Sequence, residues 1–162
     1  MLRKYITTNY KQTQKLGKEV AEEILKMPAQ KTAVVLGLQG NLGGGKTTFL
    51  QGFAKGLGIK EKILSPTFVI MKKFTLSYDR VPRRMTGQVP KYKYLYHIDC
   101  YRLKSEEDIL ELGFDEIISD PKNIVAVEWP ERIKKVLPQN TIFIDFRFID
   151  AKTREISFKT SG

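Results

Sequence analysis

One glycine-rich stretch constrains the fold of this chain more than any other feature. Residues 40–47 read GNLGGGKT and match the phosphate-loop pattern G-x-x-x-x-G-K-[ST] at every fixed position. A short apolar, β-rich run precedes this P-loop over residues 32–39, and apolar residues recur at helical spacing over residues 47–57. The order of strand, loop and helix is the one that the pattern requires. We therefore predict an α/β domain with a phosphate-binding site.

Each residue type in the P-loop has a physical role in binding a triphosphate. Backbone N–H groups can wrap phosphates only where glycines let the chain approach closely. We expect Lys46 to contact the β- and γ-phosphates, Thr47 to ligate Mg²⁺, and the following helix to direct its N-terminal dipole at the phosphates. The expected ligands are ATP and Mg²⁺, and the alternative is a glycine-rich turn without a ligand. The predicted phosphate-binding residues are Gly40, Asn41, Leu42, Gly43, Gly44, Gly45, Lys46, Thr47 and Thr48.

Two further strand candidates end in a carboxylate. Residues 93–99 end at Asp99, and residues 123–128 end at Glu128. In an open α/β sheet the ligand lies at the carboxyl ends of the parallel strands, so both acids face the nucleotide if their strands run parallel to residues 32–39. Asp99 would bind Mg²⁺ through water, and Glu128 would share that role or polarise the attacking water. The alternative for each acid is a side chain that caps a neighbouring helix.

Four more residues have both a functional and a structural interpretation. Thr67 lies where switch proteins often place a threonine that senses the γ-phosphate, although a Ser-Pro-Thr turn is the commoner explanation. His97 would point to the same face of its strand as Asp99, and a packed histidine is the simpler interpretation. Trp129 either shields the site or packs in the core. Arg102 either stabilises a transition state or forms an ion pair.

The remaining pattern predicts one domain over residues 1–162. We expect a single P-loop NTPase-type α/β domain, in which helices flank a mostly parallel central sheet that carries a C-terminal antiparallel hairpin. The other predicted elements are strands or β-rich runs over residues 3–8, 65–74, 141–149 and 154–159, and helices over residues 10–27, from Ser105 to Gly113 and from Pro130 to Val136.

The formal net charge of +10 is unevenly distributed. Residues 72–93 contain seven basic residues and one acidic residue, whereas residues 105–120 contain seven acidic and no basic residues. A polyanion such as RNA is a candidate partner for the basic segment, which includes a predicted loop insertion at about residues 75–92. A solvated basic loop is the alternative.

Composition also bears on where the protein works. The single cysteine, Cys100, excludes an internal disulfide, and we interpret it as a small buried residue. The sequence has no apolar run long enough to span a membrane and no signal-peptide pattern. We expect a cytoplasmic protein with no membrane partner.

Four segments together resemble the TsaE (YjeE) family of small P-loop ATPases, which support threonylcarbamoyladenosine synthesis on tRNA. In this sequence they read GNLGGGKTT, SPTF, YHIDCYRL and VEWPE, in this order. The similarity spans nearly the whole chain, including the T-x-x-L-G of residues 13–17. The phosphate loop is shared by many families, whereas the combination of H-x-D-x-Y-R-L with V-E-W is much more specific.

The resemblance implies a cytosolic Mg²⁺-dependent ATPase that is weakly active alone. It would act with the TsaD and TsaB proteins, which transfer a threonylcarbamoyl group to adenosine 37 of tRNA. The implied roles are phosphate and Mg²⁺ binding for Lys46 and Thr47, functional acids at Asp99 and Glu128, a switch-like threonine at Thr67, a functional neighbour of Glu128 at Trp129, and a position near the adenine for Thr13.

Two features depart from the family pattern. Asn41 stands where the family usually has aspartate, and residues 75–92 form a longer connection than usual.

Two other function classes also fit the residues. A P-loop small-molecule kinase is the first alternative, because the P-loop and Asp99 would equally permit it. No Arg-rich lid with its own fold is evident, although Arg80, Arg83 and Arg84 could imitate one. A non-catalytic RNA-binding module that uses the basic segment is the second.

Overall fold

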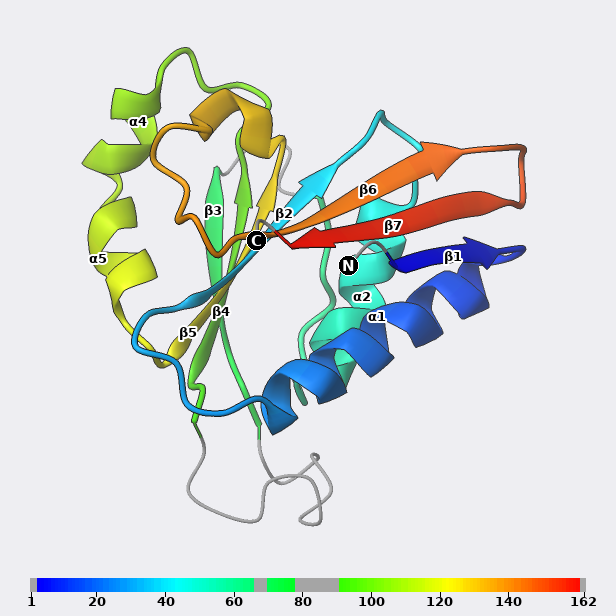
Figure 1. The fold of residues 1–162 in the computed structure, drawn as a ribbon, viewed down its shortest axis with the longest axis horizontal. Coiled ribbons are helices and arrows are strands. Elements are labelled where there is room, and N and C mark those ends of the chain that lie inside the picture. The colour runs from blue at the N-terminus through cyan, green and yellow to red at the C-terminus, as the bar shows by residue number, and fades with distance from the viewer. Residues whose placement is uncertain (1–2, 66–69, 78–90, 161–162) are drawn as a thin grey trace.

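The computed structural model describes residues 3–65, 70–77 and 91–160. They form a single α/β domain in which one seven-stranded sheet separates two layers of helices (Figure 1). In chain order the elements are β1 (Arg3–Thr7), α1 (Tyr10–Lys26), β2 (Val34–Gln39), α2 (Lys46–Gly56), β3 (Met71–Thr75), β4 (Tyr94–Asp99), α4 (Glu106–Glu111), α5 (Phe114–Ser119), β5 (Asn123–Glu128), the 3₁₀ helix η2 (Pro130–Ile133), β6 (Ile142–Phe148) and β7 (Arg154–Thr160).

The centre of the sheet is parallel and its edges are antiparallel. The strand order is β1-β7-β6-β2-β5-β4-β3. β6, β2, β5 and β4 are parallel neighbours, while β7 and β1 at one edge and β3 at the other pair antiparallel. The predicted fold class is therefore confirmed, including the closing hairpin of β6 and β7.

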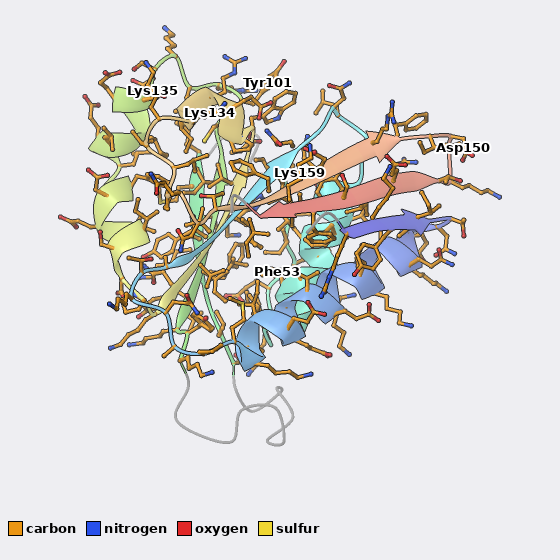
Figure 2. All side chains as sticks on the ribbon, in the orientation of Figure 1. Phe53, Tyr101, Lys134, Lys135, Asp150 and Lys159 are labelled. Atoms are coloured by element: carbon orange, nitrogen blue, oxygen red, sulfur yellow. The ribbon has the colours of Figure 1, made fainter. Side chains whose placement is uncertain are left out.

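β2 is buried on both faces, which is why it reads as an almost continuous apolar run. Leu36 and Leu38 face the core under α1 and α2, whereas Val35 faces the core under α4 and α5. Side chains of the first core, such as Phe53 of α2, are fully buried, while Lys134 and Lys135 lie at the surface (Figure 2). Covered on both sides, this strand holds the P-loop at the end of a rigid core.

α1 and α2 pack unusually close to each other because glycines stand at their contact. A Cβ atom on Gly52 would lie 1.8 Å from the carbonyl oxygen of Gln14, and one on Gly17 would lie 2.1 Å from the carbonyl oxygen of Phe49. No side chain fits in those spaces. Asn9 caps α1 as predicted, since its Oδ1 accepts a hydrogen bond from the Gln12 N–H at 3.0 Å.

Several elements differ from the expectation. Within the β-rich run predicted over residues 65–74, β3 begins at Met71, Ser65 and Ile70 are not in a strand, and residues 66–69 lie outside the described residues. The helix predicted from Pro130 is a single 3₁₀ turn. α5 was not predicted, because Gly113 at φ 79° ends α4 and starts the next helix at once, with no loop between them.

Among the described ranges, no helix is both long and apolar enough to span a bilayer. Cys100 is fully buried, and burial together with the nearby charges of Asp99, Glu131 and Glu128 raises the pKa of its thiol to about 12. A thiol that stays protonated in the core is consistent with a packing role.

The close helix contact predicts that Gly52→Ala destabilises the protein. The added methyl group has to push α1 away from α2, which we expect to cost about 2 kcal/mol of unfolding free energy or more. Denaturant titration followed by circular dichroism measures this cost. Lys55→Ala, on the exposed side of the same helix, is the control and should change stability by less than about 0.5 kcal/mol. Equal stability of the Gly52→Ala variant and the wild type would contradict this packing.

Candidate functional site

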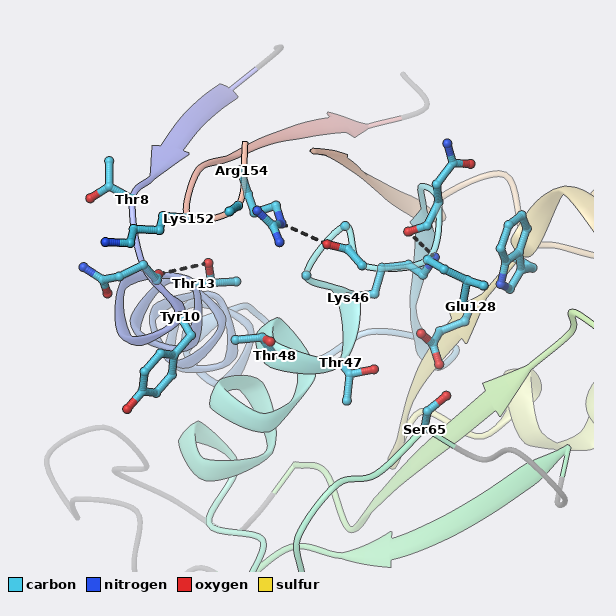
Figure 3. A pocket seen from close by; sticks show the side chains of 18 of the residues that line it. Thr8, Tyr10, Thr13, Lys46, Thr47, Thr48, Ser65, Glu128, Lys152 and Arg154 are labelled. Atoms are coloured by element: carbon cyan, nitrogen blue, oxygen red, sulfur yellow. Dashed lines mark hydrogen bonds between the residues drawn. The ribbon is translucent and has the colours of Figure 1, made fainter. Parts of the chain in front are cut away.

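A pocket of about 750 Å³ opens beside the carboxyl ends of β2, β4 and β5 (Figure 3). Its walls come from the P-loop, the start of α1, the ends of β4 and β5, and the turn between β6 and β7. The predicted site residues that line it are Thr13, Asn41, Leu42, Gly43, Gly44, Gly45, Lys46, Thr47, Thr48, Asp99, Glu128 and Trp129. Gly40 is not among the lining residues, and Thr67 lies outside the described residues.

The P-loop turns sharply where β2 ends, and glycine is required at its bends. Gly40 has φ 132°, and a Cβ atom there would lie 2.4 Å from the carbonyl oxygen of Phe146. Gly45 has φ 99° and is the N-cap of α2. Both conformations strain any residue with a side chain. The first residues of α2, Lys46, Thr47 and Thr48, line the pocket, so the N-terminus of this helix faces it.

Lys46 is held inside the site by the loop that carries it. Its side chain is buried, and Nζ donates to the carbonyl oxygens of Gly40 and Asn41 and lies 4.6 Å from the centre of the Trp129 ring. Burial lowers the pKa of Lys46, while the charges of Glu128, Glu131 and Asp99 oppose that shift. A neutral carbonyl oxygen binds an ammonium less strongly than an anion does, so Lys46 can exchange its carbonyl partners for an anionic ligand.

The two predicted acids meet at one edge of the sheet. β4 and β5 are parallel to each other, β5 is parallel to β2, and Asp99 is the direct register partner of Glu128. Asp99 is partly exposed, and its Oδ1 accepts the Tyr101 N–H at 2.9 Å. Burial raises the pKa of Asp99, and the charge of Glu128 adds to the shift, whereas the Tyr101 N–H, His97 and Lys46 oppose it. The strands that end at Asp99 and Glu128 therefore run parallel to β2, which is the arrangement that the prediction of two acids at one edge of the sheet required.

His97 contacts Glu128, a pairing that the sequence analysis missed. Its Nε2 lies 2.9 Å from Glu128 Oε2, and both side chains are almost fully buried. An ionised carboxylate only accepts hydrogen bonds, so Nε2 carries the hydrogen when Glu128 is ionised. The packed-histidine interpretation was correct about burial. The contact itself depends on β4 and β5 being neighbours, which residue spacing within one strand does not reveal.

Trp129 and Arg102 differ in their relation to the pocket. Trp129 packs against the core beneath α4 and α5, as the core interpretation predicted, and it also lines the pocket, where a shielding role stays a prediction. Its ring lies 5.1 Å from that of Tyr101. Arg102 is exposed and does not line the pocket, so the structure does not support it as an active-site arginine.

Arg154, in contrast, does reach the P-loop. Its Nε donates to the Gly43 carbonyl oxygen at 3.0 Å, and Nη1 donates to the carbonyl oxygens of Asp150 at 2.6 Å and Thr153 at 3.0 Å. Sequence reasoning missed it because no motif marks it. The sheet order β1-β7-β6-β2 brings it to the site from the far end of the chain. The other lining residues that were not predicted as site residues are Thr8, Asn9, Tyr10, Ser65, Ala151 and Lys152.

Thr13 lies directly against the P-loop. It is buried, its hydroxyl is 2.8 Å from that of Thr7, and its Cγ2 is 3.7 Å from the position of a Cβ on Gly45. This hydroxyl pair joins β1 to α1 beside the loop.

The hydroxyl of Thr47 and the carboxylates of Asp99 and Glu128 are the kinds of group that magnesium binds. Thr47, Asp99 and Glu128 line the same pocket, and Figure 3 shows Thr47 and Glu128 on the same side of the P-loop. Within the part of the chain that the structure describes, no three His, Cys, Asp or Glu side chains gather into a metal-binding group. Mg²⁺ typically takes one or two carboxylates together with water and substrate phosphates rather than a full protein cage.

Comparison with known proteins finds a consistent family. The sequence model described as "Threonylcarbamoyl adenosine biosynthesis protein TsaE" matches residues 7–156. The "tRNA threonylcarbamoyladenosine biosynthesis protein TsaE" of Bacillus subtilis is 36% identical over 159 residues, which covers 98% of this chain and 86% of that protein. The protein of the same name from Treponema pallidum is 38% identical over 123 residues, covering 76% of this chain and 79% of that protein.

A solved structure agrees with these matches. The crystal structure of Bacillus subtilis YdiB superimposes with a TM-score of 0.70 and 31% identity, and covers 100% of this chain and 87% of that one. The P-loop, the two neighbouring acids and these similarities agree with each other, and the chain belongs to the TsaE family.

Proposed function

We propose that this protein binds ATP with Mg²⁺ and hydrolyses it in support of tRNA threonylcarbamoyladenosine synthesis. The observation that carries the proposal is the convergence of Lys46 and Thr47 with the paired acids Asp99 and Glu128 in one pocket at the carboxyl ends of parallel strands. Family membership supplies the pathway, because the matching proteins are named for that biosynthesis.

In this mechanism the P-loop and Lys46 bind the triphosphate. Lys46 leaves the carbonyl oxygens of Gly40 and Asn41, because a phosphate offers a charge-assisted hydrogen bond in place of neutral ones. The N–H groups at the start of α2 direct partial positive charge at the same oxygens. The ammonium therefore changes partners within the site rather than entering it from solvent.

The hydroxyl of Thr47 and the carboxylates of Asp99 and Glu128 would hold Mg²⁺, the acids through water. The bound ion would neutralise charge that develops on the phosphates.

The two acids have different surroundings, which divides their roles. Glu128 is buried with one oxygen oriented by His97, so its second oxygen is fixed in direction and suits the positioning of an attacking water. Asp99 is more exposed and is oriented by a backbone N–H, which suits the hydration shell of a metal ion.

We further propose that the protein acts in the cytoplasm with the TsaD and TsaB proteins, and that it hydrolyses ATP weakly when alone. Thr67 falls outside the described residues, and its proposed role as a threonine that senses the γ-phosphate rests on the family resemblance. Thr13, against Gly45, is proposed to border the nucleotide. Asn41 lines the pocket where the family usually has aspartate, so in this proposal ATP binds without a carboxylate at that position.

Reconstituted threonylcarbamoylation tests the function as a whole. With purified TsaD, TsaB, a TsaC-type enzyme, tRNA and ATP, adding this protein should increase modification of tRNA, and Lys46→Ala should abolish the increase because the phosphates lose their ammonium. Lys55→Ala, on the exposed side of the same helix, is the control and should behave as the wild type. Thermal denaturation checks that both variants are folded.

The results of that assay separate the function classes. Full support of modification by Lys46→Ala would contradict the P-loop as the working site. ADP formation that depends on a small-molecule acceptor, instead of on the protein partners, would favour the kinase alternative. If this protein supports tRNA modification without itself hydrolysing ATP, the RNA-binding alternative would be favoured.

The acids should each matter for turnover. We expect Glu128→Gln and Asp99→Asn to lower ATP turnover in the full assembly by more than tenfold, about 1.4 kcal/mol of transition-state stabilisation, with the larger loss for Glu128→Gln. Asp115→Asn, on the exposed surface of α5, is the control. Release of inorganic phosphate measures turnover, and normal rates in both acid variants would refute the two-acid mechanism.

The basic segment is proposed to contact tRNA. Its flanking lysines in the described part, Lys72, Lys73, Lys91 and Lys93, are all exposed, while Arg80, Arg83 and Arg84 lie outside it. Reversing these three arginines to Glu should weaken tRNA binding by the assembly and reduce the slope of log affinity against log salt, because phosphate contacts are lost. Filter binding at several salt concentrations measures both quantities.

Two controls accompany this variant. Reversing the exposed Lys11, Lys31 and Lys55 to Glu changes net charge equally and should affect tRNA binding less. Binding of the partner proteins is measured without tRNA, since unchanged tRNA affinity with lost partner binding would reject the RNA contact and assign the segment to a protein interface.

A further inference from the structure

Two lysines converge on one aromatic ring at the end of β4 that lies away from the pocket. The Nζ atoms of Lys73 and Lys93 lie 3.8 and 5.3 Å from the centre of the Tyr94 ring, and Lys73 Nζ lies 5.6 Å from the centre of the Tyr96 ring. Both lysines are exposed and both tyrosines are half-buried. Tyr94 starts β4 and Asp99 ends it, so the lysine pair and the two acids lie at opposite ends of this strand (Figure 1).

The sheet fixes the backbone of both lysines. Lys73 of β3 is the direct register partner of Tyr96 on β4. The Lys93 N–H donates to the Lys122 carbonyl oxygen at 2.7 Å, and the Lys93 carbonyl oxygen accepts the Leu76 N–H at 3.0 Å. The two side chains therefore start from fixed positions beside the same ring.

The partners of these two lysines differ from those of five other exposed lysines. Those five form ion pairs with acids and are Lys4, Lys15, Lys18, Lys135 and Lys159. Within the part of the chain that the structure describes, neither Lys73 nor Lys93 forms an ion pair. An aromatic ring attracts an ammonium without cancelling its charge, as a carboxylate does. The charge of both lysines therefore stays available for an anion.

We propose that Lys73 and Lys93 form a phosphate-binding site for an RNA backbone, in which the Tyr94 ring holds both ammonium groups in position. Two like charges beside one ring repel each other, and an anion bound between them relieves that repulsion. Lysine binds phosphate oxygens as a point charge, and a ring that restrains its flexible stem lowers the entropy lost on binding.

The inference rests on the proposed function, because it places part of the proposed tRNA contact on two described residues. RNA is favoured over an acidic protein, since the matching proteins are named for the synthesis of a modified nucleoside of tRNA. The two ends of β4 then serve different polyanions. The strand from Tyr94 to Asp99 spans about 17 Å at the usual rise per residue, so RNA at the lysine pair leaves the pocket open to ATP.

Filter binding of an unmodified tRNA transcript to the full chain, at several salt concentrations, tests the site. Replacing Lys73 and Lys93 together by Ala should weaken tRNA binding about tenfold at low salt. The slope of log affinity against log salt should fall by about two, one unit for each lost phosphate contact. Saturating ATP with Mg²⁺ should leave the tRNA affinity of the wild type unchanged.

Matched variants separate the site from net charge and from the fold. Lys11→Ala combined with Lys134→Ala removes the same charge at exposed positions elsewhere and should change tRNA binding less. Tyr94→Phe keeps the ring and should bind tRNA as the wild type does. Tyr94→Leu keeps both lysines but not the ring, and should weaken binding severalfold without changing the salt slope. Thermal denaturation and calorimetric titration with ATP check that each variant is folded.

The outcomes distinguish this site from the rest of the proposed function. Wild-type tRNA affinity in the variant that lacks Lys73 and Lys93 overturns the site, and so does an equal loss in the Lys11 and Lys134 variant. Displacement of tRNA by ATP also overturns it, because the RNA would then occupy the pocket. If the wild type does not bind tRNA, the site is overturned, and the ATP titration of the same sample shows separately whether ATP binding stands.

Discussion

The parallel pairing of β2 with β5, and of β5 with β4, is the constraint on which the site depends. Parallel strands end at the same edge of a sheet, so the P-loop, Glu128 and Asp99 are brought together without any contact between their own side chains being needed. The buried apolar faces of these strands hold the register, since a slip by one residue would turn every side chain to the other face. The chemistry of the pocket thus depends on strand packing in the core.

The same burial also determines how the charged groups behave. Lys46, Glu128 and His97 are all nearly inaccessible to water, and each is oriented by a partner within the site. Burial opposes the charged form of Lys46 and of Asp99, while their mutual attraction supports it. An ion that binds near these charged groups would interact with them strongly, because buried surroundings have a low effective dielectric constant and screen the interaction weakly.

Local patterns predicted the elements and the acidic end of the site well. The P-loop and the strand-terminal acids are signals contained in short segments, and so is the cap at Asn9. The His97 contact, the reach of Arg154 and the place of Lys152 were missed because each depends on which strands become neighbours, a property of the whole sheet. α5 was missed for a local reason, since Gly113 both ends one helix and starts the next.

Because Arg154 donates a hydrogen bond to the Gly43 carbonyl oxygen, the stage of synthesis at which the pocket can form depends on β7. β7 follows every other element of the described chain, yet it supplies one wall of the pocket and pairs with β1, the first strand. A nascent chain that has made the P-loop, both acids and β6 still lacks that wall and leaves β1 without its neighbour. The pocket can therefore be completed only after β7 has left the ribosome, so an incomplete chain has the P-loop but not the complete pocket.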